Sequence, residues 1–433
     1  MDVISCKTKT RKGGGLLIKV IDSIMGSGKT EWAIQYMNEN PDKKIMYITP
    51  YNNEIKDRII PKCPAHNFRF AREGHKVNDF KEMLVRGSSI VATHECFKRA
   101  DEEVEALLEA NCYTLILDEV FDVVIDLHMA KADVSLVLEN FAKIENNCLA
   151  WIDDEYPDEG GKFSDIKQMA KLNKVMVYND TFFLWLFPVD IFKKFSEVYI
   201  MTYLFAGQVQ KYYFDLNHVE YQYYKVVNDG GQGYTLIEHD FVTHNNLKEL
   251  IDIYDGNLND IGRGYSKLSK SWYNNKRNKS LLKTLKNNIR NFFIHINKAK
   301  SNELIWTCFK DAEPKLKGDG YAKGFVECNC RATNKYGDRI YVAYCVNRFM
   351  RPVLKNNYFA GHGIEVNEDL WALAEMLQLL WRSAIRNGKR IYLYIPSERM
   401  RNLLLQFMDN EIDVDYTGNN FGRLNLPKPL ESA

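Results

Sequence analysis

Short apolar runs alternate with helical stretches along the first half of the chain. The runs are rich in Ile, Val, Leu and Tyr, as is typical of strands buried on both faces, and a helical stretch, Glu31–Asn38, follows the first of them. The runs cover Leu16–Ile21, Lys43–Thr49, Ser89–Ala92, Tyr113–Leu117 and Glu197–Thr202. Strands that alternate with helices form βαβ units, whose strands are parallel. The pattern therefore predicts an α/β lobe over residues 1–207.

A second alternating series lies in the last third of the chain. Its predicted strands and helices are Glu303–Cys308, Arg339–Tyr344, Asp369–Asn387, Arg390–Tyr394 and Glu398–Met408. We predict a second α/β lobe over residues 301–415 and a C-terminal tail over 416–433. An acidic, aromatic-rich stretch of about residues 126–195 is interpreted as an insertion in the first lobe. Residues 208–300, first tyrosine-rich and then basic, are interpreted as an accessory connector.

The strongest local motif stands between the first predicted strand and the first predicted helix. Residues 23–30 read SIMGSGKT, which matches the phosphate-binding pattern GxxxxGK[ST] except that a serine replaces the first glycine. In such a loop, Gly26, Ser27 and Gly28 would turn backbone N–H groups toward phosphate oxygens. Lys29 would neutralise the β and γ phosphates, and Thr30 would offer its hydroxyl to Mg²⁺. The motif predicts a nucleotide site.

Two carboxylates end the predicted strand at 113–117. Asp118 would hold Mg²⁺, directly or through water, and Glu119 would orient or deprotonate the attacking water. Together with the phosphate loop, this pair predicts ATP binding with Mg²⁺ and ATP hydrolysis. Kinases, transporters, packaging motors and helicases all remain compatible with these residues.

Charge is balanced over the whole chain but segregated along it. The 58 Lys+Arg and 57 Asp+Glu give a net charge of +1, and a content of 45% hydrophobic residues is typical of a globular protein. Residues 101–160 hold 17 acidic and 2 basic side chains, whereas residues 263–300 hold 11 basic and no acidic ones. No apolar run approaches the roughly 20 residues of a membrane span, and no signal-peptide pattern is present. We expect a cytoplasmic protein without a membrane partner.

The motifs, taken in order, resemble those of superfamily 2 nucleic-acid helicases, especially phage and herpesvirus-type origin-binding protein helicases, whose first motif also contains MGSGKT. Residues 48–53 (ITPYNN) resemble motif Ia, 89–95 (SIVATHE) motif Ib, and 331–334 (RATN) motif V. Residues 200–204 (IMTYL) stand at motif III, where only the threonine matches the usual Ser-Ala-Thr. The resemblance implies two RecA-like lobes and nucleic-acid contacts from Pro50, Tyr51, Asn52, Thr93, His94 and Thr333.

Residues 378–386 (QLLWRSAIR) resemble motif VI, which distinguishes two-lobed helicases from other phosphate-loop enzymes. The resemblance implies that Gln378 contributes to the nucleotide site. Arg382 and Arg386, on a helix of the second lobe, would reach the γ-phosphate held by the first lobe. Arginines in that role stabilise the charge that develops during phosphoryl transfer, and their position on another lobe makes hydrolysis depend on closure.

The basic stretch 263–300 interleaves cations with aromatic residues. Lys276, Arg277 and Lys279 would contact phosphates, while Trp272, Tyr273, Phe292 and Phe293 could stack on bases. Leucine, isoleucine and phenylalanine also recur there at helical spacing, so a solvated helix with one core-facing side is the alternative interpretation.

The sequence therefore favours an ATP-dependent nucleic-acid helicase or translocase, acting on DNA rather than RNA. The phage-like resemblance implies a role in DNA replication or recombination beside other proteins of those processes, in the host cytoplasm if the source is viral. One alternative is a replication-initiation or origin-binding protein that uses ATP only as a conformational switch. Another is a phage DNA-packaging ATPase, which would require a cluster of carboxylates for a two-metal nuclease.

Overall fold

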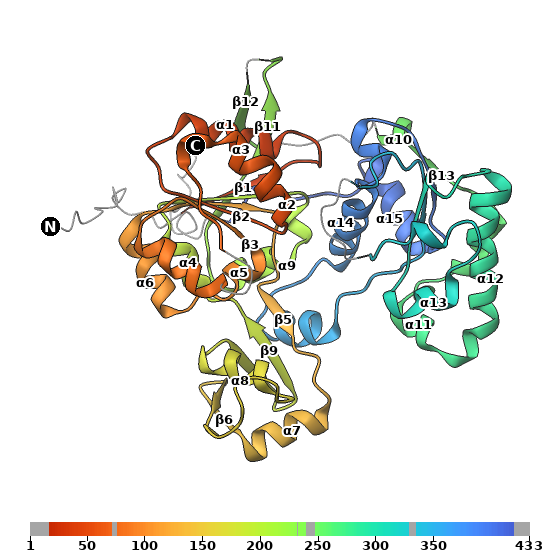
Figure 1. Ribbon diagram of the computed structural model, residues 1–433. Helices are drawn as coiled ribbons and strands as arrows, with labels where there is room; N and C mark the ends of the chain where they lie inside the picture. Colours follow the sequence, from red (N-terminus) through yellow and green to blue (C-terminus); the bar gives the residue numbers. More distant parts are fainter. Residues whose placement is uncertain (1–16, 72–75, 232, 240–246, 329–334, 420–433) are drawn as a thin grey trace, which may run out of the picture.

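The computed structural model describes residues 17–71, 76–231, 233–239, 247–328 and 335–419 of the 433-residue chain. Two α/β lobes lie side by side, and a smaller domain projects from the first (Figure 1). Each lobe is built on a sheet of parallel strands. The predicted α/β class with two parallel-sheet lobes is confirmed. No helix within the described residues is long and apolar enough to cross a membrane.

The first lobe contains a seven-stranded sheet in the order β12-β11-β1-β10-β4-β2-β3. Only β12 is antiparallel to its neighbour. The parallel strands end at one edge of the sheet, which brings the segments after β1, β4 and β10 together. The strand bounds are β1 Ile18–Asp22, β2 Ile45–Thr49, β3 Ile90–Thr93, β4 Thr114–Asp118, β10 Glu197–Thr202, β11 Tyr221–Asn228 and β12 Tyr234–Glu238.

Helices cover both faces of this sheet (Figure 1). Because side chains alternate between the faces of a strand, Val20 and Leu117 belong to one buried cluster, while Ile21 and Ile116 belong to the other. The helices are α1 Lys29–Glu39, α2 Asn52–Glu54, α3 Ile60–Lys62, α4 Lys76–Val85, α5 His94–Phe97, α6 Glu102–Asn111 and α9 Val209–Leu216.

The acidic stretch that interrupts the first lobe folds as a separate five-stranded antiparallel sheet in the order β5-β9-β8-β7-β6. Its first and last strands pair with each other, Val124 opposite Leu186, so the domain leaves and re-enters the lobe at one place. Its elements are β5 Val124–Asp126, α7 Lys131–Asn140, β6 Ala142–Glu145, β7 Cys148–Trp151, α8 Ser164–Lys171, β8 Val175–Tyr178 and β9 Phe182–Leu186.

The second lobe contains four parallel strands in the order β13-β16-β15-β14. Helices α14 and α15 lie on the side of the first lobe, and α12 lies on the far side (Figure 1). The elements are α10 Leu247–Leu250, β13 Ile251–Ile253, α11 Lys270–Asn274, α12 Lys279–Arg290, β14 Leu304–Thr307, α13 Glu313–Leu316, β15 Tyr341–Tyr344, α14 Glu368–Leu380, β16 Ile391–Tyr394 and α15 Glu398–Met408.

The stretch predicted as a connector, 208–300, is divided between the two lobes. Strands β11 and β12 extend the first sheet, and Tyr221 and Tyr223 of β11 are buried in its core. Strand β13 completes the second sheet, and Leu285 and Ile289 of α12 pack in one cluster with Trp306 of β14. Each of these elements has an apolar side that must be buried, and pairing with or packing against one of the two sheets buries it.

Two segments bind the lobes together. Tyr203 and Leu204, directly after β10, are buried in the core of the second lobe. In the other direction, residues 350–366 leave the second sheet after β15, and Met350, Tyr358 and Phe359 pack into the core of the first lobe. The lobes therefore share buried surface through both crossings.

Candidate functional site

A cleft of about 910 Å³ separates the two lobes and contains most of the residues that the motifs predicted. The first lobe contributes the phosphate loop and the acidic pair, and the second contributes the motif VI residues. The predicted residues that line it are Gly26, Gly28, Lys29, Thr30, Pro50, Tyr51, Asn52, Asp118, Glu119, Gln378, Arg382 and Arg386. Segments more than 300 residues apart in sequence thus meet in one cleft.

The phosphate loop has the backbone conformation that its glycines permit. Gly26 and Gly28 have φ angles of 86° and 95°, in the left-handed region that other residues rarely adopt. The loop leads directly into α1, and within the described chain no side chain caps the start of that helix. The first N–H groups of a helix lack partners inside the helix and carry partial positive charge. This arrangement suits a phosphate group.

Lys29 lies at the centre of the loop and is buried. Its ammonium donates to the backbone carbonyl oxygens of Ser23 and Ile24, the latter at 3.2 Å. Burial lowers the pKa of Lys29, and the carboxylates of Glu119, Asp22 and Asp118 oppose that shift. The lysine therefore carries its charge against carbonyl groups of its own loop, at the floor of the cleft.

The acidic pair ends β4 beside the loop. The Asp118 carboxylate accepts hydrogen bonds from the Tyr47 hydroxyl at 3.1 Å and the Thr49 hydroxyl at 3.4 Å. Burial and the charge of Glu119 raise the pKa of Asp118 to about 7. Glu119 has a left-handed φ of 64°, and its N–H donates to the Met201 carbonyl at 2.9 Å. The turn after β4 is thus tied to β10.

The oxygen donors of the cleft fit a magnesium ion. The Thr30 hydroxyl and the Asp118 carboxylate both line it, and hard oxygen ligands of this kind are those that Mg²⁺ prefers together with phosphate oxygens. A cation between them would also neutralise the negative charge that raises the pKa of Asp118.

Two buried polar atoms of the site lack a hydrogen-bond partner among the described residues: the Ser27 hydroxyl and Nη1 of Arg382. Arg382 is 6% exposed, and its Nε donates to the Gln378 carbonyl at 3.1 Å. Buried polar groups are rarely left unsatisfied because each costs about 1–3 kcal/mol. Both atoms belong to motifs expected to hold a triphosphate, so a bound anion would satisfy them.

The sequence had predicted that the motif VI arginines lie on one continuous helix, and this prediction is wrong. Helix α14 ends at Leu380, because the Ser383 hydroxyl donates to the Leu380 carbonyl and the Ala384 N–H donates to the Arg339 carbonyl instead of continuing the helix. Arg382 lies in the resulting turn and Arg386 in the short 3-10 helix Ala384–Asn387.

The turn that carries Arg386 lies close to the phosphate loop. The Arg386 carbonyl oxygen is 3.7 Å from the position that a Cβ on Gly26 would occupy. The positive charge of Arg386 also acts on Lys29, lowering the pKa of the lysine. The turn after α14 therefore lies next to the phosphate loop.

The predicted nucleic-acid residues of the first lobe occupy different positions. Pro50, Tyr51 and Asn52 line the cleft itself. Thr93 accepts the N–H of Cys96 and caps α5. His94 is 5% exposed, and its Nε2 lies 2.9 Å from the Asp118 carbonyl oxygen, so its ring faces the interior and not a nucleic-acid surface. Thr333 lies outside the described residues.

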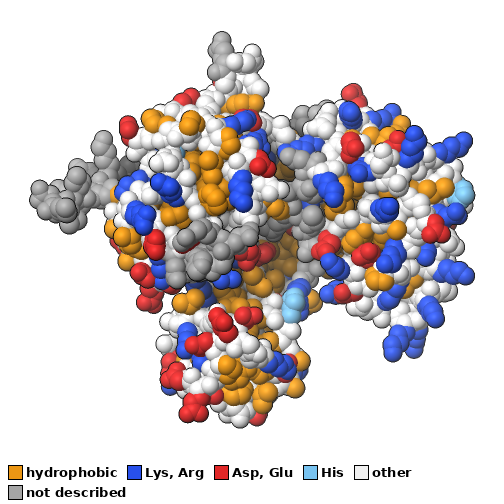
Figure 2. Space-filling model, in the orientation of Figure 1, with side chains coloured by type: hydrophobic (Ala, Val, Ile, Leu, Met, Phe, Trp, Pro, Cys, Tyr) orange, Lys and Arg blue, Asp and Glu red, His pale blue; other side chains and the backbone are white. Residues whose placement is uncertain are grey.

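The basic stretch has a cationic outer face. Lys276, Arg277 and Lys279 are exposed around the start of α12. Helix α12 lies on the side of the second lobe away from the first (Figure 1), and basic side chains gather on that side (Figure 2). The predicted base-stacking residues are instead buried, so that prediction is wrong: the apolar side of α11 and α12 covers the second sheet. They are Trp272, Tyr273, Phe292 and Phe293, each at most 7% exposed.

Two residues that line the cleft, Tyr234 and Lys335, belong to none of the motifs. Trp381 also lines it, inside motif VI, although no role was predicted for it. Tyr234 begins β12, and its ring lies over Gly28, where a Cβ would be 2.2 Å from Cε1 of the tyrosine. Its N–H donates to the Gln35 side chain of α1 at 2.8 Å. A hairpin partner that returns from 200 residues downstream leaves no local pattern.

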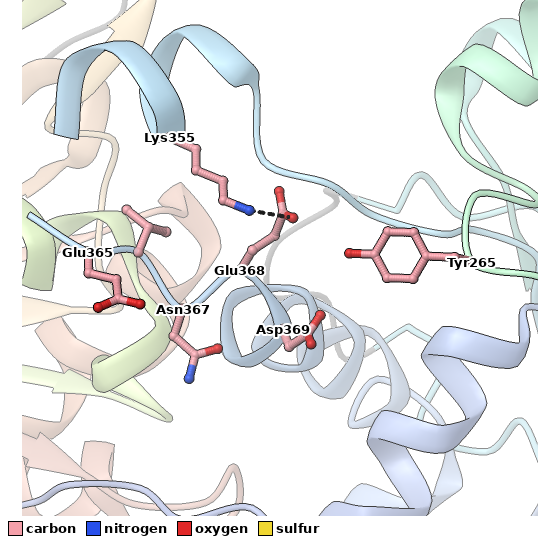
Figure 3. A pocket seen from close by; sticks show the side chains of 7 residues that line it. Tyr265, Lys355, Glu365, Asn367, Glu368 and Asp369 are labelled. Carbon is pink, nitrogen blue, oxygen red and sulfur yellow. Dashed lines mark hydrogen bonds and ion pairs between the residues drawn. The ribbon is translucent and has the colours of Figure 1, made fainter. Parts of the chain in front are cut away.

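A second, smaller cavity of about 460 Å³ lies where residues 350–367 return to the second lobe (Figure 3). Two of its three acidic residues are already paired. Glu368 accepts Lys355 and the Met350 N–H, each at 2.9 Å, and Asp369 accepts the guanidinium of Arg399. These ion pairs fix the start of α14, and they leave no constellation of charges comparable to that of the large cleft.

Two family models match the chain: the YonV middle domain over residues 124–185 and the YonV C-terminal Rossmann-like domain over residues 245–408. A curated relative, the SPbeta prophage-derived uncharacterized protein YonV of Bacillus subtilis (strain 168), is 41% identical over 411 residues, which cover 91% of this chain and 99% of the relative. The chain belongs to the YonV family. The two YonV domains correspond to the projecting antiparallel sheet and to the second lobe with its α12 region.

Solved structures to which the chain is similar include the apo structure of XPD and a structure of Xpd4 from S. tokodaii. The first has a TM-score of 0.48 at 10% identity and covers 90% of this chain and 95% of its own. The second has a TM-score of 0.45 at 11% identity and covers 92% and 94%.

Proposed function

We propose that this YonV-family protein is a nucleoside triphosphatase that uses ATP to move along or unwind nucleic acid, DNA in preference to RNA. The observation that carries the proposal is the cleft, in which a phosphate loop and an acidic pair of one lobe face two arginines of the other. Such a division of one site between lobes lets nucleotide binding and release alter the relation of the lobes.

The residues divide the work by their chemistry. Lys29 and the N–H groups at the start of α1 would bind the phosphates, and Thr30 and Asp118 would hold the magnesium ion, which would neutralise charge on the phosphate oxygens. Glu119 would orient the attacking water. The guanidinium groups of Arg382 and Arg386 would stabilise the negative charge of the transition state from the opposite lobe.

Two observations support nucleic acid as the partner. The helicase-type motifs follow one another in the expected order, and a cationic face without acidic residues in its sequence stretch lies on the second lobe. A prophage-derived relative is consistent with a role in phage DNA replication or recombination. Contacts made mainly to the backbone would give weak sequence specificity.

The test is steady-state ATP hydrolysis by the full chain in the presence of single-stranded, duplex, forked and four-way DNA and of RNA. Wild-type protein should hydrolyse ATP faster with at least one DNA substrate than without nucleic acid. Lys29→Ala should lose nucleotide binding, and Glu119→Gln should bind ATP without hydrolysing it. ATP binding without stimulation by any nucleic acid would refute the motor and leave a nucleotide switch.

A further inference from the structure

Asp22, the last residue of β1, does not line the cleft, but it is completely buried beside it and its charge acts on Lys29. Its two carboxylate oxygens each accept one backbone N–H at 2.8 Å, from Leu204 and from Phe205. These consecutive residues follow β10 after a single residue, Tyr203, and Thr202 at the end of β10 pairs with Asp22 across the sheet. One carboxylate therefore binds two neighbouring amides of the segment at motif III.

The backbone of this segment is shaped to receive an anion. Leu204 has a φ of 51°, in the left-handed region that a leucine rarely occupies. A left-handed residue turns consecutive N–H groups to the same side and forms a concave nest for negative charge. Asp22 supplies that charge from within the chain, and hydrogen bonds to a carboxylate are stronger than those between neutral groups.

The same segment is packed into the second lobe. Tyr203 and Leu204 belong to the buried core that α14 and α15 form there. Gly207 touches the start of α14 so closely that a Cβ would lie 2.8 Å from the carbonyl carbon and oxygen of Leu370. Helix α14 carries Gln378 and leads into the turn of Arg382. Asp22 thus binds the segment against which the start of α14 packs.

On its other side, Asp22 adjoins the phosphate loop. The ammonium of Lys29 is bound to the carbonyls of Ser23 and Ile24, the two residues that follow Asp22. Burial raises the pKa of Asp22 to about 6, while the two N–H groups and the charge of Lys29 oppose the rise. A phosphate that attracts the Lys29 ammonium would release both carbonyls next to Asp22 and remove part of its neutralising charge.

We propose that Asp22 is a positioning residue that transmits the state of the phosphate loop to the second lobe through the amides of Leu204 and Phe205. This inference rests on the proposed nucleotide binding and adds to it the path by which a bound triphosphate changes the position of α14 and of the arginines after it. Asp22 touches neither the nucleotide nor the reacting water in this arrangement.

Hydrogen exchange measured by mass spectrometry, on the full chain with and without Mg²⁺ and a non-hydrolysable ATP analogue, tests the link. In wild type, the analogue should slow exchange in the phosphate loop and also in residues 203–207 and α14. In Asp22→Asn, one N–H faces an amide nitrogen instead of an oxygen. The affinity for the analogue and the protection of the phosphate loop should stay within about threefold of the wild-type values. The slowing of exchange in residues 203–207 and α14, about tenfold in wild type, should disappear.

Asp126→Asn is the matched control, because Asp126 is also a buried aspartate that bonds to the second half of the chain, through Arg351, but lies outside the cleft. It should respond to the analogue like wild type. Gly207→Ala disturbs the other end of the link without changing Asp22 and should show the same loss in α14. If Asp22→Asn does not fold, hydrogen exchange in Gly207→Ala tests the link in its place.

The outcomes separate the two proposals. If wild type binds no nucleotide, the proposed function fails and the link with it. If wild type binds the analogue and the Asp22→Asn and Gly207→Ala variants keep full protection of α14, the link alone is refuted. The direct packing of Ile24 and Met25 against the second lobe would then be the path.

Discussion

Gly28 shows how closely single residues of the cleft are fitted to one another. Its φ of 95° is costly for any residue with a Cβ, and the ring of Tyr234 fills the space that a Cβ would need. The glycine of the motif was predictable from the phosphate that it would bind. Its second constraint, the tyrosine, was not, because the contact depends on a hairpin that joins the sheet 200 residues later.

We predict that Gly28→Ala lowers the free energy of unfolding by about 2 kcal/mol or more, since left-handed backbone strain alone costs about 1–2 kcal/mol and the methyl group would overlap the tyrosine ring. Urea denaturation measures the change. In the double variant Gly28→Ala/Tyr234→Ala, the overlap is gone and only the strain remains, so the two substitutions should be less than additive. Strict additivity would mean that the ring does not restrict this position.

Arg382 presents the clearest mechanistic test among the residues. Its Nη1 is buried and lacks a hydrogen-bond partner within the described chain, so the guanidinium is available to a ligand in the cleft. We predict that Arg382→Ala slows ATP hydrolysis about a thousandfold while ATP affinity, measured by calorimetry, changes little, because an arginine of this kind acts on the transition state.

Arg390→Ala is the control for this variant, because Arg390 is an exposed arginine nearby in sequence that pairs with Asp252 at 2.9 Å. It should hydrolyse ATP at the wild-type rate. Normal hydrolysis by Arg382→Ala would exclude closure of the second lobe onto the nucleotide through this residue.

At the scale of elements, most parallel strands were predictable, including the edge strands β3 and β14, whereas the places of β11, β12 and β13 in the two sheets were not. β2, β4 and β10 are short apolar runs buried on both faces, which is a strong local signal. β13 has three residues, and its place beside β16 depends on a partner far along the chain. The end of α14 was also missed, because a hydrogen bond to Arg339 and not a glycine or proline stops the helix.

The projecting domain is held to the first lobe by a buried lysine. Lys174, just before β8, is 3% exposed, and its ammonium donates to the carbonyls of Lys98 and Ala100 in the first lobe. Burial lowers the pKa of Lys174 to about 8, against the opposing charges of Asp101 and Glu105. Below that pH, the native state must hold a charged group that is poorly hydrated.

This gives a pH prediction with a defined sign. Between about pH 8 and 10 the native Lys174 loses its proton while the unfolded chain keeps it, so the unfolded state binds more protons and stability rises with pH. Relative to Lys174→Met, wild type should gain on the order of 1 kcal/mol in unfolding free energy from pH 8 to 9.5. Lys171→Met replaces a half-exposed lysine of α8. The difference in unfolding free energy between wild type and this variant should therefore not change over the same pH range.

At the scale of the whole molecule, the balanced net charge conceals a division of charge between regions. Acidic side chains gather on the projecting domain and basic ones on the outer side of the second lobe (Figure 2). The segregation could be read from the sequence, but its geometry could not: the basic stretch around α12 lies on the side of the second lobe away from the first. Its aromatic residues Trp272, Tyr273, Phe292 and Phe293 are buried. Any nucleic acid bound there would be held through its phosphates and not by base stacking.

Neutralising Lys276, Arg277 and Lys279 together with glutamine should therefore weaken DNA binding without a change of sequence preference. Each phosphate contact contributes about 0.7–0.9 to the slope of log affinity against log salt, so the slope should fall by about 2 to 3. Titrations of labelled single-stranded and duplex DNA at several salt concentrations measure it. A slope equal to that of wild type would make this face an ordinary solvated surface.

The control must remove the same charge from elsewhere, because a change of three charges alters the long-range field of the whole molecule. Lys143, Lys162 and Lys193 suit this purpose: each is more than half exposed and paired with a carboxylate on the projecting domain or the first lobe. Their replacement by glutamine should leave the salt slope within about one unit of wild type. If both triple variants reduced the slope equally, total charge and not the face around α12 would determine the affinity for DNA.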